Sequence, residues 1–120
     1  MTKIIERREV RYFEAEDARC PYVEWRDELD VRTQAILAAR ISRLEAGNPG
    51  HVESLGDGLH ELKIDVGPGY RIYFGNAHGQ LVIVLAGGSK RHQSKDIAEA
   101  KVFWKDWKVR NESKPSKSKR

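Results

Sequence analysis

The sequence predicts an α+β fold in which a helical hairpin precedes a small, mainly antiparallel sheet and one further helix closes the domain. Residues 61–66 alternate between polar and apolar side chains, which is the period of a half-buried strand, and a partner strand is expected at residues 70–74. The run 81–86 is apolar on both faces and indicates a central strand. Helical patterns before and after these strands give the order strand, helix, helix, strand, strand, strand, helix.

The N-terminal third supplies the first strand and the two helices of the hairpin. We expect the strand at residues 8–15. Pro21 is placed to begin a short helix, because proline is favoured in the first turn of a helix. Asp30 can cap the next helix, 31–46, and Gly47 can end it. The apolar stripe of this second helix consists of Leu37, Ala38, Ile41 and Leu44.

The segments 59–66 and 70–74 are separated by Gly67, Pro68 and Gly69, so we expect them to form a hairpin. The expected cross-strand pairs are Val66 with Tyr70, Asp65 with Arg71, Ile64 with Ile72, and Lys63 with Tyr73. This register gathers polar side chains on the face opposite the aliphatic one, namely Lys63, Asp65, Arg71 and Tyr73. Such a set is either an ordinary solvated surface or a rigid site for a phosphate group.

A second group of polar side chains follows the central strand. The strand is expected to end at Gly87 and Gly88, and the chain then leaves the edge of the sheet with Ser89, Lys90, Arg91, His92 and Gln93. Because these residues leave the same sheet, we expect them to lie beside the polar face of the hairpin. His92 is either a proton donor, since histidine titrates near neutral pH, or an exposed loop histidine. Ser94 can cap the closing helix.

Charge is unevenly distributed along the chain. The 120 residues have a formal net charge of +4. Residues 108–120 contain six basic residues and one acidic residue, so the rest of the chain is close to neutral. We therefore expect one domain, 1–107, followed by a basic, disordered tail, 108–120. The tail either adds nonspecific attraction to RNA or is simply solvated.

The composition also limits the cellular location and the cofactors. The single cysteine, Cys20, cannot form an internal disulfide, which fits a reducing cytoplasm. No apolar run approaches the roughly 20 residues that span a bilayer, and we recognise no signal peptide. We expect a cytoplasmic protein with no membrane partner. The four histidines lack the paired spacing of a zinc site, so neither a metal nor another cofactor is expected.

Ordered motifs along the chain resemble a known family. They lie at residues 25–30, 41–50, 56–64, 67–74 and 85–100, and together they cover nearly the whole expected domain. Their order and spacing are similar to those of the HigB-like "addiction module killer" branch of the RelE/ParE toxin superfamily. The resemblance implies a RelE-like fold and the toxin of a type II toxin–antitoxin pair.

The resemblance also implies partners and leaves alternative targets open. Members of this branch typically cut mRNA on the ribosome, and a cognate antitoxin, usually a helix-turn-helix DNA-binding protein, silences them. Operator DNA is reached only through that antitoxin. The related ParE branch instead poisons DNA gyrase, so a noncatalytic gyrase inhibitor is an alternative. A degenerate homologue that only binds its antitoxin is another.

Metal-free RNA cleavage would use the RNA's own 2′-hydroxyl as the nucleophile. Arg71 could stabilise the charge on phosphorus, because its planar guanidinium contacts two phosphate oxygens. Lys63 is either the base or a second electrostatic clamp. Lys90 and Arg91 could hold phosphate, and His92 could protonate the leaving oxygen.

The resemblance places basic residues of ribosome-dependent members at Lys63, Arg71 and Lys90. Tyr73 could stack on a base or donate a hydrogen bond to the substrate, and Gln93 is a further candidate for substrate binding. The sequence departs from the family after the sheet, where many members carry a tyrosine. Here Gln93 and Ser94 follow His92 instead.

Overall fold

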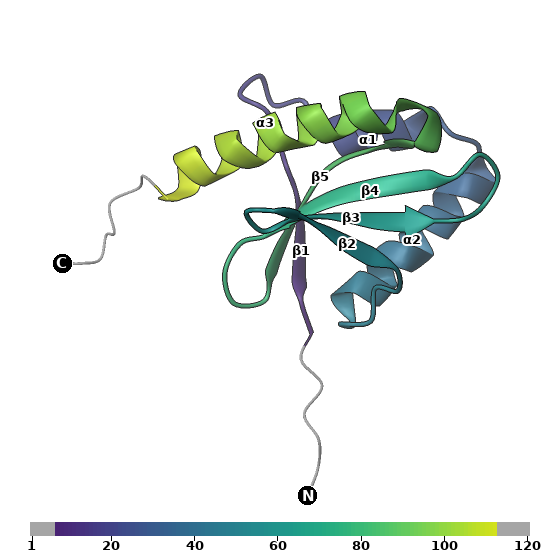
Figure 1. Cartoon of the computed structure of the whole chain (residues 1–120), viewed down its shortest axis with the longest axis horizontal. Coiled ribbons are helices and arrows are strands. Elements are labelled where there is room, and N and C mark those ends of the chain that lie inside the picture. The colour runs from purple at the N-terminus through teal and green to yellow at the C-terminus, as the bar shows by residue number, and fades with distance from the viewer. Residues whose placement is uncertain (1–6, 113–120) are drawn as a thin grey trace, which may run out of the picture.

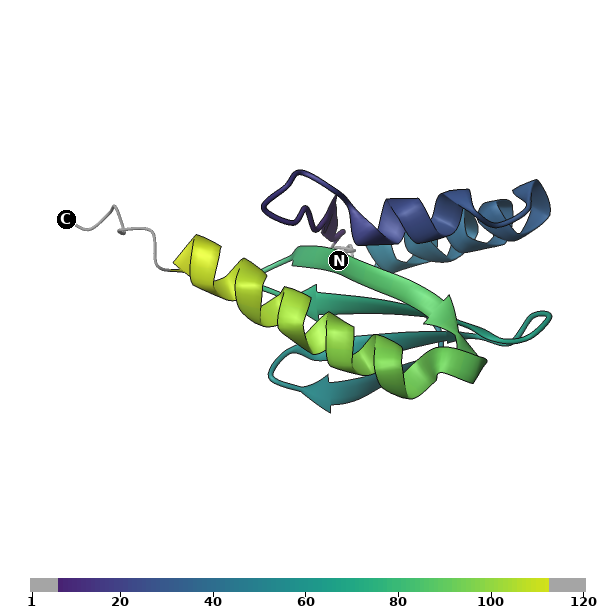
Figure 2. The ribbon, with the colours of Figure 1, turned by 90° about the horizontal axis from the view of Figure 1, so that it is seen from above.

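A five-stranded sheet separates two helical layers in the computed structural model, which describes residues 7–112. Helix α3 crosses one face of the sheet, and helices α1 and α2 cover the other (Figures 1 and 2). The elements in chain order are β1 (Glu9–Tyr12), α1 (Pro21–Asp27), α2 (Val31–Glu45), β2 (Val52–Gly56), β3 (Leu59–Ile64), β4 (Tyr70–Asn76), β5 (Leu81–Ser89), the 3₁₀ turn η1 (Lys90–His92) and α3 (Gln93–Glu112). The predicted α+β class is confirmed.

The strands lie in the order β1-β5-β4-β3-β2. Only the β1–β5 pair is parallel among the described strands, so the sheet is mainly antiparallel as predicted. The predicted order of elements lacked β2, which pairs with β3 at the edge of the sheet. This strand is short and half exposed, and its alternation ends at a bulge between Ser54 and Gly56, so it carries little apolar signal.

The predicted hairpin register is wrong by two residues. In the structure Ile64 pairs with Tyr70, and Lys63 pairs with Arg71. The strand ends at Ile64, so Asp65 lies in the connecting loop instead of opposite Arg71. An offset of two keeps each side chain on its predicted face, because side chains alternate with a period of two. Lys63, Arg71 and Tyr73 therefore still share one face.

Both faces of the sheet are buried. The face toward α1 and α2 packs Leu62, Ile64, Ile72, Phe74, Val82 and Val84 against Leu37, Ile41 and Leu44 of α2. The face toward α3 packs Leu59, Tyr73, Ile83 and Leu85 against Ala100 and Trp104. The polar face of the hairpin is consequently covered by a helix along much of its length.

The helix ends follow local sequence signals. Pro21 occupies the first turn of α1, and Asp30 is the residue before α2, although its side chain makes no capping bond. Gly47, with φ of +85°, follows the end of α2 in the left-handed conformation that suits glycine. Ala38, expected in the apolar stripe of α2, is exposed, and Thr33 is buried there instead.

Helix α3 differs at both ends from its prediction. It begins at Gln93, one residue before the expected cap Ser94, and it continues through Glu112. Residues 108–112, assigned above to the basic tail, are therefore helical. The remaining residues of that tail, 113–120, lie outside the described part of the chain.

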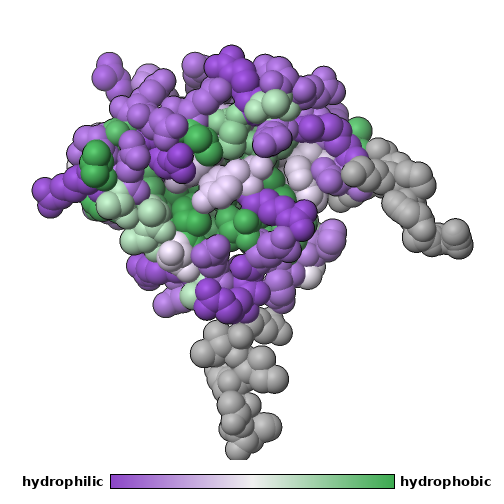
Figure 3. Space-filling view, turned by 180° about the vertical axis from the view of Figure 1, so that it is seen from behind, coloured by the Kyte–Doolittle hydropathy of each residue, from purple (hydrophilic) through white to green (hydrophobic). Residues whose placement is uncertain are grey.

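From the side of α1 and α2, the surface shows apolar residues gathered in its middle among hydrophilic ones (Figure 3). Within residues 7–112, no helix is long and apolar enough to cross a membrane.

Candidate active site

The β3–β4 hairpin and the end of β5 bring three of the predicted cations to one end of the sheet. Lys63 of β3 lies opposite Arg71 of β4, and Arg71 lies opposite Gly88 of β5. Lys90 follows β5, and its backbone N–H donates to the carbonyl of Gly69 at 2.9 Å. A Cβ atom at Gly69 would lie 3.4 Å from Lys90 Cβ and 3.5 Å from Arg71 Nη1, so the side chains of Lys90 and Arg71 flank the same glycine.

Arg71 is largely buried, and its residue is only 5% exposed. Its Nε lies 3.6 Å from Glu61 Oε2, which makes an ion pair but not a hydrogen bond, and this nitrogen has no hydrogen-bond partner. Nη1 donates to the carbonyl of Tyr70 at 3.4 Å. Arg71 is therefore a cation held below the surface, with a small opening to solvent.

Glu61 is the common partner of the buried polar groups at this end of the sheet, although it is not among the residues predicted for the site. Its side chain is buried, and Oε2 accepts hydrogen bonds from the Tyr73 hydroxyl at 3.1 Å and from Gln93 Nε2 at 2.8 Å. With Arg71, three groups from β4 and α3 converge on one carboxylate. A buried carboxylate needs such partners, because an unpaired one is strongly disfavoured.

Tyr73 does not have the predicted substrate-binding role. It is fully buried, with 0% exposure, and its hydroxyl donates to Glu61. Burial, and next the adjacent Glu61 carboxylate, raise the pKa of Tyr73 well above its ordinary value. Because no part of the ring reaches the surface, Tyr73 offers nothing on which a base could stack.

Lys63 remains accessible, with its side chain 20% exposed. Its Nζ lies 3.0 Å from Glu53 Oε2 on the neighbouring strand β2. The hydrogen bond and charge of Lys63 lower the pKa of Glu53, so the two form a charged pair at the edge of the sheet. Glu53 was absent from the predicted site because β2 itself was not predicted.

The turn η1 presents Lys90, Arg91 and His92 at the surface, and all three residues are exposed. Gln93, the first residue of α3, is half buried and directs its amide nitrogen inward to Glu61. Gln93 thus links the start of α3 to the buried carboxylate, whereas the three residues before it face solvent. We retain Lys90, Arg91 and His92 as accessible site residues.

A pocket of about 190 Å³ lies beside η1 and is lined by Trp25, Gly87, Gly88, Ser89, His92, Lys95 and Asp96. Gly88 leaves room for the Asp96 carboxylate, which a Cβ atom at this position would overlap. Burial, and next the charge of Glu99, raise the pKa of Asp96, whereas His92 acts in the opposite direction. Trp25 is an aromatic side chain in the lining of this pocket, whereas the Tyr73 ring is buried.

The described residues contain no group of three or more His, Cys, Asp or Glu side chains that could hold a metal ion. Cys20 is half buried and unpaired. The chemistry available to this end of the sheet is that of cations, two exposed imidazoles and a buried carboxylate network that fixes Arg71. The imidazoles are those of His92 and of His51, whose Nε2 lies 3.6 Å from Glu53 Oε2.

Comparison with known proteins identifies relatives of this chain. Residues 24–105 match the family model described as "Phage derived protein Gp49-like (DUF891)". An uncharacterized protein of Haemophilus influenzae is 50% identical over 74 residues, which make up 62% of this chain and 75% of that protein. The matched segment runs from α1 through most of α3 and includes the hairpin, the end of β5 and η1.

Proposed function

Because the chain belongs to the Gp49-like family of phage-derived proteins, we propose that it is the toxin of a toxin–antitoxin pair and that it cuts mRNA. The partners in this proposal are the translating ribosome with its mRNA and a cognate antitoxin, a helix-turn-helix protein through which operator DNA is bound. The proposed location is the cytoplasm, where these partners occur.

The observation that carries the nuclease proposal is the meeting of Lys63, Arg71 and Lys90 at one end of the sheet. They come from β3, β4 and the turn after β5, so the rigid sheet fixes their spacing. Arg91 and His92 extend this group along η1. Positive groups held at one end of a rigid sheet are suited to stabilising the extra charge of a phosphoryl transition state.

In the proposed reaction, the 2′-hydroxyl of the RNA gives its proton to solvent and its oxygen attacks the adjacent phosphorus. The bond from phosphorus to the 5′-oxygen breaks, and that oxygen takes up a proton. The products are a 2′,3′-cyclic phosphate and a 5′-hydroxyl. His92 is the proposed proton donor, since its imidazole is exposed and directly follows Lys90 and Arg91 in η1.

The cations have separate roles in this proposal. Lys63 is already paired with Glu53, which favours a clamp on the phosphate over a base. Lys90 and Arg91 are exposed and can follow the RNA backbone. Arg71 is buried beneath them, so it acts mainly through its field on the phosphate. Low dielectric strengthens such a field.

The proposal is tested by inducing the protein in bacteria and mapping new 5′ ends in cellular mRNA. The wild type should arrest growth and produce cuts inside translated frames. Lys63→Ala and Lys90→Ala should each lose the cuts, because each removes an accessible clamp. Arg32→Ala, which removes an exposed cation from α2, is the matched control and should behave as wild type.

Two outcomes would contradict the proposal. Growth arrest without new cuts, undiminished by either lysine substitution, would point to a noncatalytic target such as gyrase. The absence of growth arrest would point to a homologue that only binds its antitoxin.

A further inference from the structure

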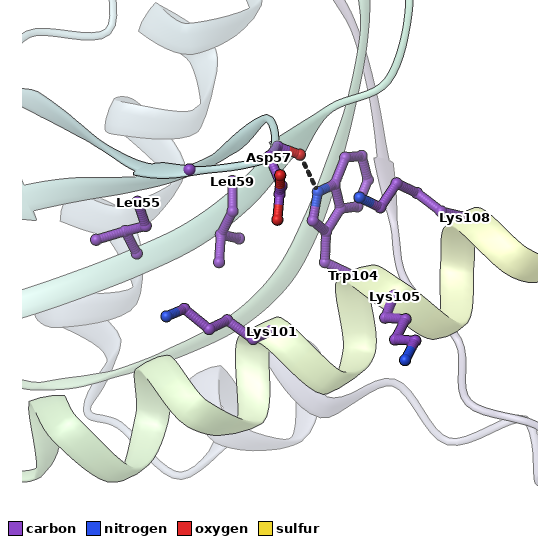
Figure 4. Close-up of a pocket in the computed structure, with 8 residues that line it drawn as sticks. Leu55, Asp57, Leu59, Lys101, Trp104, Lys105 and Lys108 are labelled. Carbon is purple, nitrogen blue, oxygen red and sulfur yellow. Dashed lines mark hydrogen bonds between the residues drawn. The ribbon is translucent and has the colours of Figure 1, made fainter.

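A second surface lies at the other end of β3, where the β2–β3 turn meets the middle of α3. A pocket of about 490 Å³ opens there, lined by Leu55, Gly56, Asp57, Leu59, Lys101, Trp104, Lys105 and Lys108 (Figure 4). From Gln93 to Lys105 a helix rises about 18 Å at 1.5 Å per residue. The pocket is therefore separate from the start of α3, although β2 also carries Glu53, the ion-pair partner of Lys63 in the candidate active site.

The floor of the pocket is apolar and fixed in place. Trp104 donates its indole N–H to the carbonyl of Asp57 at 2.7 Å, which joins α3 to the β2–β3 turn. Trp104 is 3% exposed and Leu59 is 1% exposed, whereas Leu55 on β2 is only half buried. A ligand would therefore contact a preformed apolar floor, with the half-buried side chain of Leu55 beside it.

The rim of the pocket is basic. Lys101, Lys105 and Lys108 are four and three residues apart, so they lie on the same side of α3. Within residues 7–111, none of the three has a carboxylate partner, and Lys108 instead lies over the Trp104 ring at 5.2 Å. Asp57 supplies one opposing charge in the lining. The rim is thus complementary to an anionic ligand.

The neighbouring edge of the sheet is available for pairing. Strand β2 is the last in the strand order. Lys63 donates its backbone N–H to the carbonyl of His51 at 3.0 Å. Because bonding groups alternate along an antiparallel strand, the backbone groups of Val52 and Ser54 point away from β3. An extended peptide can add to such an edge by main-chain hydrogen bonds.

We propose that this edge and pocket bind an acidic, extended segment of a partner protein. The segment adds alongside β2, places an apolar side chain against Leu55, and sets its carboxylates against Lys101 and Lys105. The structure favours a peptide over RNA, because the Trp104 ring is buried and gives no stacking platform.

The test is a selection of random twelve-residue peptides, displayed on phage, against the full-length protein. We expect enriched peptides to be acidic and to alternate between apolar and polar residues. The best peptide is then titrated against wild type and against the double variant Lys101→Glu with Lys105→Glu. Affinity should fall at least tenfold. Lys95→Glu changes the charge of the same helix away from the pocket, and it should bind within twofold of wild type.

Nuclear magnetic resonance of the labelled protein locates the peptide, and circular dichroism verifies that each variant is folded. Shifts confined to β2, the turn and residues 101–108 would support the proposal. Enriched peptides without acidic character, or equal binding by the double variant, would overturn it. So would tighter binding of a single-stranded RNA oligonucleotide with the same dependence on Lys101 and Lys105.

Discussion

Glu61 is buried, although its position in an alternating strand would suggest an exposed side chain. A carboxylate in an alternating strand normally faces solvent, yet Glu61 is 1% exposed and contacts Tyr73 and Gln93. Strand alternation alone places it on the face of Lys63 and Arg71. The burial could not be predicted in the same way, because it depends on where α3 crosses the sheet.

Replacing Glu61 by glutamine leaves Arg71 as a buried cation without a counter-charge. We expect Glu61→Gln to lower the free energy of unfolding by about 3 kcal/mol, the usual cost of removing one partner of a buried ion pair. Urea denaturation measures this loss. Adding Arg71→Met should recover most of it, since no buried charge then remains. A double variant no more stable than Glu61→Gln would argue against the pairing.

We expect His60 to make the stability of the fold dependent on pH. Arg8 donates to Asn76 Oδ1, so the Asn76 amide nitrogen faces His60 Nε2 at 3.0 Å and requires that nitrogen to be unprotonated. Burial, and next the charge of Arg8, lower the pKa of His60 below its ordinary 6.5. The unfolded chain therefore takes up this proton at a higher pH than the folded protein does.

We expect the free energy of unfolding to decline as the pH falls through 6.5 toward the lower pKa of folded His60. Well above pH 6.5, His60 is unprotonated in both the folded and the unfolded state, so its full contribution to the free energy of unfolding is present. Thermal melts across this range measure the decline. His60→Gln keeps an acceptor for Asn76 and should flatten the profile; a profile as steep as that of wild type would exclude His60 as its source.

At the scale of elements, the helix limits could be predicted better than the strand pairing. Pro21 and Asp30 set the starts of α1 and α2 through local geometry, and the structure agrees with both. The predicted register of the β3–β4 hairpin was wrong because five residues, 65–69, form the connecting loop instead of three. Turn length depends on the closing contact between Gly69 and Val66, which residue type does not specify.

Each helical layer rests on the sheet through a tryptophan packed on a glycine. Trp25 of α1 lies over Gly87 of β5, and Trp104 of α3 lies over Gly75 of β4. A Cβ atom at either glycine would overlap the aromatic ring. These two glycines therefore set how closely α1 and α3 approach the sheet.

We expect Gly75→Ala to destabilise the protein by about 1–3 kcal/mol, the usual cost of overpacking a core. The reason is that the Trp104 ring is rigid and cannot yield as a flexible side chain would. Chemical denaturation of Gly75→Ala, Trp104→Leu and their combination measures the coupling. The combined loss should be smaller than the two single losses added together; strict additivity would mean that the two residues do not meet.

At the scale of the whole molecule, the candidate site could be predicted in part. The meeting of Lys63, Arg71 and Lys90 follows from strand parity and from the position of Lys90 just after β5, both of which the sequence contains. The burial of Tyr73 and the inward direction of Gln93 follow from α3 covering the sheet. That covering is a long-range property, and no local pattern indicates it.

The most direct test of the proposed chemistry is the structure of the RNA ends in a translation reaction to which the purified protein is added. Attack by the 2′-hydroxyl predicts cut mRNA with a 2′,3′-cyclic phosphate on one fragment and a 5′-hydroxyl on the other. Lys63→Ala and Lys90→Ala should suppress both ends, and Arg32→Ala should not. Uncut mRNA, or fragments that carry a 5′-phosphate, would contradict the account.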